Sequence, residues 1–207
     1  TVQDTELPTI AAMADITQNM DAGACSAVVT WSDPVTSDNC GIQGIAYSTA
    51  SGSAFPLGAT TVTATATDDA GNTATTSFTV TVTDDENPVI SDMPANISQS
   101  NDAGACAAAV TWTAPTADDN CSVSSFTSTH SPGDQFAVGT TTVTYTAIDG
   151  SNNTISASFN VVVADTEDPA IANVPSNISV TTDADACGAT VTWTCLLYTS
   201  PSPRDEK

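Results

Sequence analysis

Carboxylates and cysteines are the reactive side chains that this sequence supplies in quantity. It holds 24 Asp and Glu, 6 Cys and 1 His among 207 residues, against only 2 Lys and Arg. Carboxylates that gather without a neutralising cation suit hard divalent ions such as Ca²⁺, and paired cysteines suit disulfides. The positions of these two residue types therefore define the chemistry to consider first.

The acidic residues recur in linkers, hairpins and loops. Three linkers share one pattern, in which an Asp is followed two residues later by a Glu and four residues later by a Pro. We expect the acids of a linker to meet those of a neighbouring hairpin and loop and to bind Ca²⁺ there. The candidate ligands are Asp4, Glu6, Asp38, Asp68, Asp69, Asp84, Asp85, Glu86, Asp118, Asp119, Asp149, Asp165 and Glu167.

An alternative reading of these acids needs no metal. No Asp-x-Asp-x-Asp-Gly calcium loop is present, and acids in linkers and turns are commonly solvated. In that reading Asp38 and Asp119 cap turns through their own side chains. The sequence leaves both readings open.

The charge balance excludes several classes of function. The formal net charge is -22, and the two basic residues, Arg204 and Lys207, both lie at the end of the chain. Nucleic-acid binding, a Walker-type nucleotide loop and binding to anionic membranes all need basic residues. The single His130 falls in a Ser-rich loop, where we expect it to be exposed and without a role. We therefore expect no catalytic residues and no enzymatic activity.

Two cysteine pairs have the same spacing. Cys25 and Cys40 are separated by 15 residues, as are Cys106 and Cys121. We predict a disulfide within each pair, which implies an oxidising compartment. Zinc is the competing interpretation, but two cysteines without a histidine do not complete a four-ligand structural site.

Internal repetition defines the domain organisation. The cysteines at 25, 106 and 187 are spaced by 81 residues, as are the tryptophans at 31, 112 and 193. We assign residues 1–3 to the end of a preceding repeat, 4–83 to the first complete repeat, 84–164 to the second, and 165–194 to a truncated third. From Cys195 onward the register is lost. Residues 195–207 resemble a translated sequencing-library adapter, and we interpret them as an artefact without a part in folding or function.

Period-two alternation predicts strands inside each repeat. Apolar and Thr residues alternate in 61–66 and 142–147, and an acidic, Gly- and Asn-rich turn separates each of these segments from the next alternating one. Val29 with Trp31, and Val110 with Trp112, suggest another inward-facing strand. About seven short strands in some eighty residues indicate an all-β fold, namely tandem immunoglobulin-like β-sandwich repeats.

The ordered motifs of both complete repeats resemble the hyalin repeat (HYR) domain. Those motifs are DAGAC at 21–25 and 102–106, VTW at 29–31 and 110–112, SDNC at 37–40, DDNC at 118–121, SFTVTV at 77–82 and SFNVVV at 158–163. The resemblance implies a non-catalytic, immunoglobulin-like extracellular repeat associated with cell adhesion. Family members commonly carry two further cysteines, which are both missing here, and this joint loss favours the pairing of the two that remain.

These observations favour a non-catalytic extracellular repeat array, secreted or on the cell surface, that acts as an adhesion or spacer module. Its expected partners are neighbouring repeats of the same chain and an extracellular protein or glycan that the sequence does not identify; nucleic acid and membrane insertion are not expected. The alternative is an accessory region of a larger secreted hydrolase. A carbohydrate-binding module is disfavoured because aromatic residues are only 5% of the chain and fall on inward positions.

Overall fold

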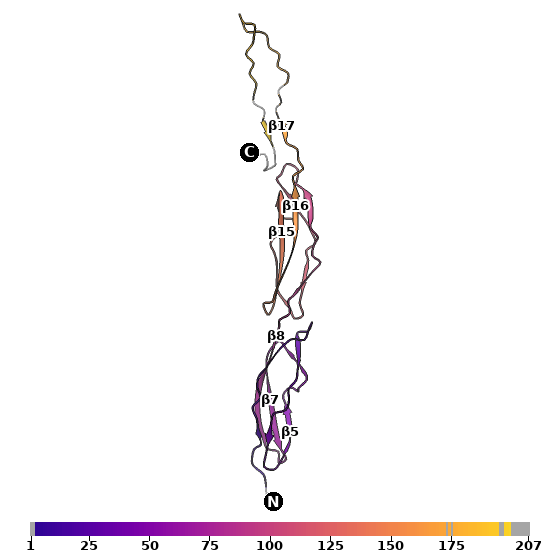
Figure 1. Cartoon of the computed structure of the whole chain (residues 1–207), viewed down its shortest axis with the longest axis vertical. Coiled ribbons are helices and arrows are strands. Elements are labelled where there is room, and N and C mark those ends of the chain that lie inside the picture. The colour runs from indigo at the N-terminus through magenta and orange to yellow at the C-terminus, as the bar shows by residue number, and fades with distance from the viewer. Residues whose placement is uncertain (1–2, 173, 175, 195–196, 200–207) are drawn as a thin grey trace. The chain divides into compact units, whose positions relative to one another are not determined.

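The computed structural model describes residues 3–172, 174, 176–194 and 197–199, and every regular element among them is a β-strand. Eight strands, β1 to β8, build the first complete repeat, and a second set, β9 to β16, repeats their order (Figure 1). The all-β, immunoglobulin-like fold predicted from the sequence is therefore confirmed. None of the described residues forms a helix long and apolar enough to cross a membrane.

The first repeat is a sandwich of one large sheet and smaller strand pairs. The large sheet has the order β2-β8-β7-β5, and β3 pairs with β6 while β1 pairs with β4. The strands are β1 (Thr9–Ile10), β2 (Ile16–Asn19), β3 (Ser26–Val29), β4 (Thr36–Ser37), β5 (Ile42–Tyr47), β6 (Ser53–Pro56), β7 (Gly58–Asp68) and β8 (Thr73–Thr83).

The core of this repeat follows from the alternation of Thr with apolar residues in β7 and β8. Val62, Ala64 and Ala66 in β7 are fully buried, and Val62 lies opposite Phe78 of β8, which is buried as well. The threonines between them lie on the other face of the sheet, because successive side chains of a strand point to opposite sides. The predicted inward faces of these two strands are thus confirmed.

Strand β2 pairs with β8 in parallel, which the sequence pattern did not predict. Ile16 lies opposite Val80, and the Asp15 carboxylate just before β2 accepts a hydrogen bond of 2.7 Å from the backbone N–H of Thr79. A parallel neighbour cannot follow from a hairpin, so this strand begins far away in sequence and joins the free edge of β8.

The second repeat has the same arrangement, with a large sheet of order β10-β16-β15-β13 and the pairs β11-β14 and β9-β12. Val143, Tyr145, Ala147, Val161 and Val163 form its buried face. Its strands are β9 (Val89–Ser91), β10 (Ile97–Ser100), β11 (Ala107–Ala109), β12 (Thr116–Asp118), β13 (Val123–Ser128), β14 (Gln135–Ala137), β15 (Gly139–Asp149) and β16 (Thr154–Ala164).

Two predictions for aromatic residues need correction. Trp31 and Trp112 lie beyond β3 and β11 rather than in them, yet both are half-buried, and Trp31 makes edge contacts with Tyr47 at 5.5 Å and Phe78 at 5.1 Å between ring centroids. The tryptophans are therefore core residues, as expected, but on loops. His130 is half-buried rather than exposed, because its ring lies 5.0 Å from that of Phe136.

The chain divides into two compact units that do not coincide with the repeats. The first comprises the described residues up to Ser91 together with 117–127 and 146–156, so it includes a loop and the hairpin of the second repeat. The second unit comprises 92–116, 128–145 and the described residues from 157 onward.

A short strand pair lies in the C-terminal part. Strand β17 (Ala170–Ala172) pairs antiparallel with β18 (Leu197–Thr199). Three tail residues thus take part in backbone pairing, contrary to the expectation that the tail has no place in the fold. The rest of the tail, 195–196 and 200–207, lies outside the described residues, and its origin as an adapter artefact stays a prediction.

Candidate functional site

The β15–β16 hairpin is organised around one buried carboxylate. Asp149 is 1% exposed, and its Oδ1 accepts hydrogen bonds of 2.8 Å from the backbone N–H groups of Ser151 and Asn153. Its Oδ2 accepts a bond of 2.7 Å from the side-chain amide of Asn153, which also donates to the Asp84 carbonyl at 3.3 Å. The hairpin therefore fixes the linker that precedes β9.

The β7–β8 hairpin is built in the same way around Asp68, which is fully buried. Its Oδ1 accepts from the backbone N–H groups of Ala70 and Asn72 at 2.9 and 2.8 Å, and its Oδ2 accepts from the Asn72 amide at 2.8 Å. Burial by itself would raise the pKa of Asp68, but these hydrogen bonds favour the charged form more strongly and lower it. Because three hydrogen bonds within the hairpin already hold its carboxylate, Asp68 is a structural residue first.

Three of the predicted ligands come together beside the second hairpin. One carboxylate oxygen from each of Asp84, Asp119 and Asp149 lies within 4.8 Å of the others. Asp84 Oδ2 and Asp119 Oδ1 are buried without a hydrogen-bond partner, while the other Asp119 oxygen accepts from the backbone N–H groups of Cys121 and Ser122 at 2.9 and 3.0 Å. The arrangement leaves two buried anionic oxygens free to bind a cation. We call these three residues the carboxylate cluster.

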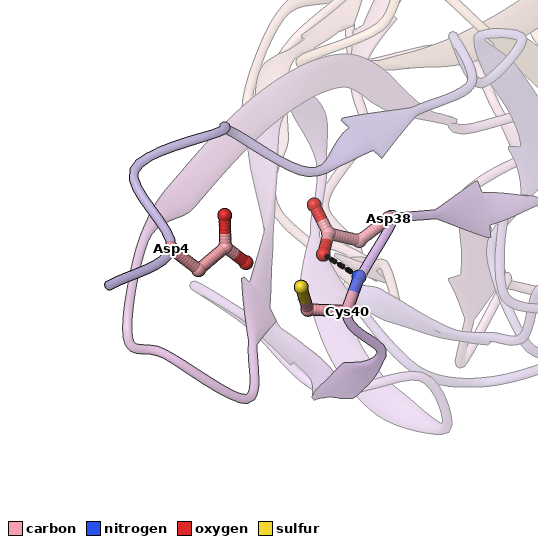
Figure 2. Close-up of side chains that lie close together, drawn as sticks. All are labelled: Asp4, Asp38 and Cys40. Carbon is pink, nitrogen blue, oxygen red and sulfur yellow. Dashed lines mark hydrogen bonds between the residues drawn. The ribbon is translucent and has the colours of Figure 1, made fainter. Parts of the chain in front are cut away.

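A second group lies at the start of the first repeat, where Asp4 and Asp38 are the counterparts of Asp84 and Asp119. Asp4, Asp38 and Cys40 also place one ligand atom each within 4.8 Å of one another, and Figure 2 shows the three side chains close together. The backbone N–H of Cys40 donates to Asp38 at 2.8 Å. Interaction with the Asp4 carboxylate raises the pKa of the Cys40 thiol, and burial and the charges of Asp38 and Asp68 act in the same direction.

The remaining candidate ligands are not in these groups. Each glutamate bonds elsewhere: Glu86 accepts from the Gly23 N–H at 3.0 Å, Glu167 accepts from the Gly104 N–H at 2.9 Å, and Glu6 accepts from the Asn39 amide at 2.7 Å. Asp85 accepts from the Asn19 amide, Asp165 accepts from the Glu167 N–H at 3.2 Å, and Asp69 and Asp118 are exposed.

The predicted disulfides are wrong in their pairing. The structure joins Cys25 to Cys121, with 4.8 Å between their Cα atoms, and Cys40, Cys106 and Cys187 are free thiols. The bond joins the first complete repeat to the loop before β13. The presence of a disulfide, which the sequence also predicted, is confirmed.

The reason is the length of the sandwich. The loop before Cys25 is bonded to the last residue of β8, through the Met20 N–H and the Thr83 carbonyl at 2.9 Å. Cys40 adjoins Gly41, whose carbonyl accepts from Asp69 at the far end of β7. Strand β7 has 11 residues, which span about 35 Å. A disulfide needs Cα atoms within about 7 Å, so two cysteines at opposite ends of one sandwich cannot bond.

Comparison with known proteins gives two consecutive matches to the HYR domain, over residues 3–82 and 83–163. The chain belongs to the HYR domain family. A curated relative, Hyalin from Strongylocentrotus purpuratus, is 35% identical over 104 residues, which is 47% of this chain and 8% of Hyalin. The chain thus spans a small part of that relative's length. Membership of the HYR family indicates an extracellular module of the adhesion type.

Solved structures with some similarity include cadherin repeats. Drosophila N-cadherin EC1-4 matches 77% of this chain and 50% of its own, with 13% identity and a TM-score of 0.36. Human protocadherin-24 EC1-2 matches 76% of this chain and 99% of its own, with 14% identity and a TM-score of 0.35. Scores at this level describe a loose similarity.

Sequence reasoning missed the partners of the HYR linker acids. The Gly23 and Gly104 N–H groups bind the glutamates 63 residues further on, and the Asn120 amide donates to the Ala24 carbonyl at 3.3 Å. The recurrence of Asn72 and Asn153 at the same place after a hairpin aspartate was a usable signal. The backbone N–H donors gave no such signal, because every residue type except Pro supplies a backbone N–H group.

Proposed function

We propose that this HYR array is a non-catalytic extracellular module that acts in adhesion or as a spacer. The observation that carries the proposal is the tandem family match over residues 3–163. The composition supports it, because a chain with 1 His and 2 basic residues offers few groups for acid–base or nucleophilic catalysis.

A mechanical role is supported by the position of the disulfide. The bond encloses a segment with a sequence separation of 96 residues that includes nearly all of the first repeat after Cys25. Tension applied to the chain ends cannot extend that segment while the bond is intact. A connector between a surface and a binding region benefits from such protection.

Pulling the full chain by its ends tests the spacer role. In non-reducing buffer the residues between Cys25 and Cys121 should contribute nothing to the length gained on unfolding; with a reductant the gain should increase by about 330 Å, which follows from about 3.5 Å per extended residue. Equal gains in both buffers would contradict a load-sparing disulfide. In parallel, beads coated with the chain and mixed with cells report adhesion, and coated beads that adhere no better than albumin-coated beads leave the spacer role alone.

The alternative is an accessory region of a larger secreted hydrolase. It differs from the array in what flanks this segment, so the sequence of the complete gene distinguishes the two. A catalytic domain beside these repeats would favour the alternative, and further HYR repeats would favour the array.

We further propose that the carboxylate cluster binds Ca²⁺. Asp84, Asp119 and Asp149 offer hard oxygen ligands at one place, and two of the oxygens are buried without a partner. A buried carboxylate without a partner is costly, and at a net charge of -22 no lysine or arginine is close in sequence to offset it. A cation at this position removes the repulsion between the three carboxylates.

Calorimetric titration of the full chain with CaCl₂ at constant ionic strength tests this proposal. Asp119→Asn should abolish or strongly weaken binding, because it removes a buried anionic oxygen. Asp118→Asn is the matched control, since it removes the same charge from an exposed neighbour outside the cluster. If both variants and the parent chain respond alike to millimolar calcium, the acids are solvated linker and turn residues.

A further inference from the structure

We propose that Cys40 and Cys106 each form a disulfide with a cysteine of an adjacent repeat, equivalent to the disulfide that links Cys25 to Cys121. HYR repeats of this kind are then crosslinked one to the next. In the 81-residue register, Cys106 corresponds to Cys25 and Cys40 corresponds to Cys121. The partner of Cys106 is then the second cysteine of a following repeat, and the partner of Cys40 is the first cysteine of a preceding one. This inference is independent of the adhesive role.

The loop that carries the first cysteine has one conformation in every copy. In the first repeat the Asp21 N–H donates to the Ser26 carbonyl at 2.9 Å, and the Asp21 side chain accepts from Val28 at 3.0 Å. Around Asp102 the same two bonds measure 2.8 and 3.0 Å. Around Asp183 they measure 2.8 and 3.1 Å. The free cysteines Cys106 and Cys187 are therefore presented as Cys25 is in the formed disulfide.

Positive φ at the centre of this loop points the same way. Gly23 and Gly104 have φ of 70° and 71°, and Asp185 takes a φ of 65° at the equivalent place in the third copy. Asp is one of the non-glycine residues that adopt the left-handed region most readily, so the third copy keeps the same turn without a glycine.

The end that carries the second cysteine is also the same in both complete repeats. The Cys40 N–H donates to Asp38 at 2.8 Å, as the Cys121 N–H donates to Asp119 at 2.9 Å. The linker aspartate before each repeat accepts from the Glu two residues later at 3.1 Å in both copies. The scaffold around Cys40 is thus preformed, although its sulfur is free.

The polar groups that bond across the Cys25–Cys121 disulfide have counterparts near Cys40 that bond each other instead. At the disulfide, the Asn120 amide donates to the Ala24 carbonyl and Glu86 accepts from the Gly23 N–H. Their counterparts Asn39 and Glu6 instead bond each other at 2.7 Å. A hydrogen-bond donor and an acceptor that lack an adjacent repeat to contact bond each other instead. This is the arrangement expected before a crosslink to another repeat has formed.

Formation of the bond needs an oxidant, which we name as a low-molecular-weight disulfide such as oxidised glutathione. The Cys106 thiolate attacks one glutathione sulfur, forms a mixed disulfide and releases one reduced glutathione. The thiolate of the partner cysteine then displaces the second glutathione. Two protein thiols and one oxidised glutathione become one protein disulfide and two reduced glutathiones.

The test uses an extended chain in which residues 165–207 are replaced by a second copy of residues 84–164. It keeps both complete repeats, has six cysteines and places the copy's second cysteine 96 residues after Cys106, the separation found in the observed disulfide. After folding in a glutathione redox buffer, thiols are titrated in denaturant without reduction. The proposal predicts two free thiols, at Cys40 and at the copy's first cysteine.

The other counts contradict the proposal. Pairing within each repeat leaves no free thiol, and a single disulfide between Cys25 and Cys121 leaves four. Cys106→Ser in the extended chain should raise the count from two to three, because only its partner is released. The same variant under pairing within repeats raises the count from none to one. A peptide map that contains Cys106 joined to any cysteine other than the copy's second one also overturns the proposal.

Discussion

The loop that carries the second cysteine has matching residues in the two complete repeats, but those residues make different contacts. In the second repeat, Cys121 is bonded to Cys25, and the Asn120 amide donates to the Ala24 carbonyl. In the first repeat, Cys40 is a free thiol and the Asn39 amide donates to Glu6. Equivalent residues therefore bond the first repeat in one place and each other in the other place.

A second difference concerns the third member of each acidic group. Beside Cys121 the buried hairpin residue Asp149 completes the carboxylate cluster, whereas beside Asp4 and Asp38 the third ligand atom is the Cys40 sulfur. A hard cation prefers oxygen to sulfur. A disulfide at Cys121 is thus compatible with Ca²⁺ bound at the carboxylate cluster beside it, because the ion does not need the sulfur as a ligand.

Removing the disulfide should have the largest effect. Cys25→Ser should lower the free energy of unfolding by about 4–5 kcal/mol, because a crosslink with a sequence separation of 96 residues restricts the unfolded chain strongly. The measurement is urea unfolding followed by tryptophan fluorescence. Cys106→Ser is the matched control and should change stability by less than about 0.5 kcal/mol. Equal losses for both variants would show that the two cysteines do not differ in bonding.

Replacing the hairpin carboxylates should have the next largest effect. Asp68→Asn and Asp149→Asn each turn an amide group toward the amide of Asn72 or Asn153, which leaves buried donors without an acceptor. Each should cost about 1–3 kcal/mol. Only Asp149→Asn should also weaken the calcium response, since Asp68 is outside both acidic groups. A calcium response that both variants reduce equally would contradict this division of roles.

The two core tryptophans offer a smaller contrast. Trp112 Nε1 donates to the buried Tyr145 hydroxyl at 2.8 Å, while Tyr47 in the first repeat donates to Asp33, which is exposed, at 2.9 Å. Tyr145→Phe should cost about 1 kcal/mol because the indole N–H loses its acceptor. Tyr47→Phe should cost less, because water can replace the phenol at Asp33. Thermal unfolding of both variants measures the two losses of stability. A larger loss for Tyr47→Phe than for Tyr145→Phe would contradict the roles given to the two hydroxyl groups.

Acid should destabilise the first repeat gradually. Hydrogen bonds hold the pKa of Asp68 below its usual value. Its contribution to stability is therefore complete above the unfolded-state pKa of about 3.9 and is lost as the pH falls through the lower folded-state value. Asp68→Asn should flatten this part of the pH profile between pH 5 and pH 2. An unchanged profile would show that other carboxylates govern acid unfolding.

Much of the fold could be predicted because it depends on local periodicity. The alternation in β7, β8, β15 and β16 identified the buried residues of both large sheets, and the turn residues after Asp68 and Asp149 identified the hairpins. The parallel pairing of β2 with β8 could not be predicted in this way, because no turn joins the two strands and their pairing depends on tertiary packing.

The site was predicted in part. The gathering of Asp84, Asp119 and Asp149 followed from the recurrence of acids before and inside each repeat. The predicted cysteine pairing is wrong because a spacing of 15 residues does not imply proximity when the segment runs from one end of the sandwich to the other. Spacing in sequence shows which positions are equivalent between repeats; it does not show which of them touch.

A non-reducing peptide map of the full chain tests the disulfide between Cys25 and Cys121 most directly. Trypsin is unsuitable, because Lys and Arg occur only at the end of the sequence, so cleavage at Asp and Glu is needed. Before digestion, free thiols are blocked with an alkylating reagent. We expect a crosslinked peptide pair that contains Cys25 and Cys121, with Cys40 and Cys106 alkylated. Crosslinks of Cys25 to Cys40 and of Cys106 to Cys121 would contradict it.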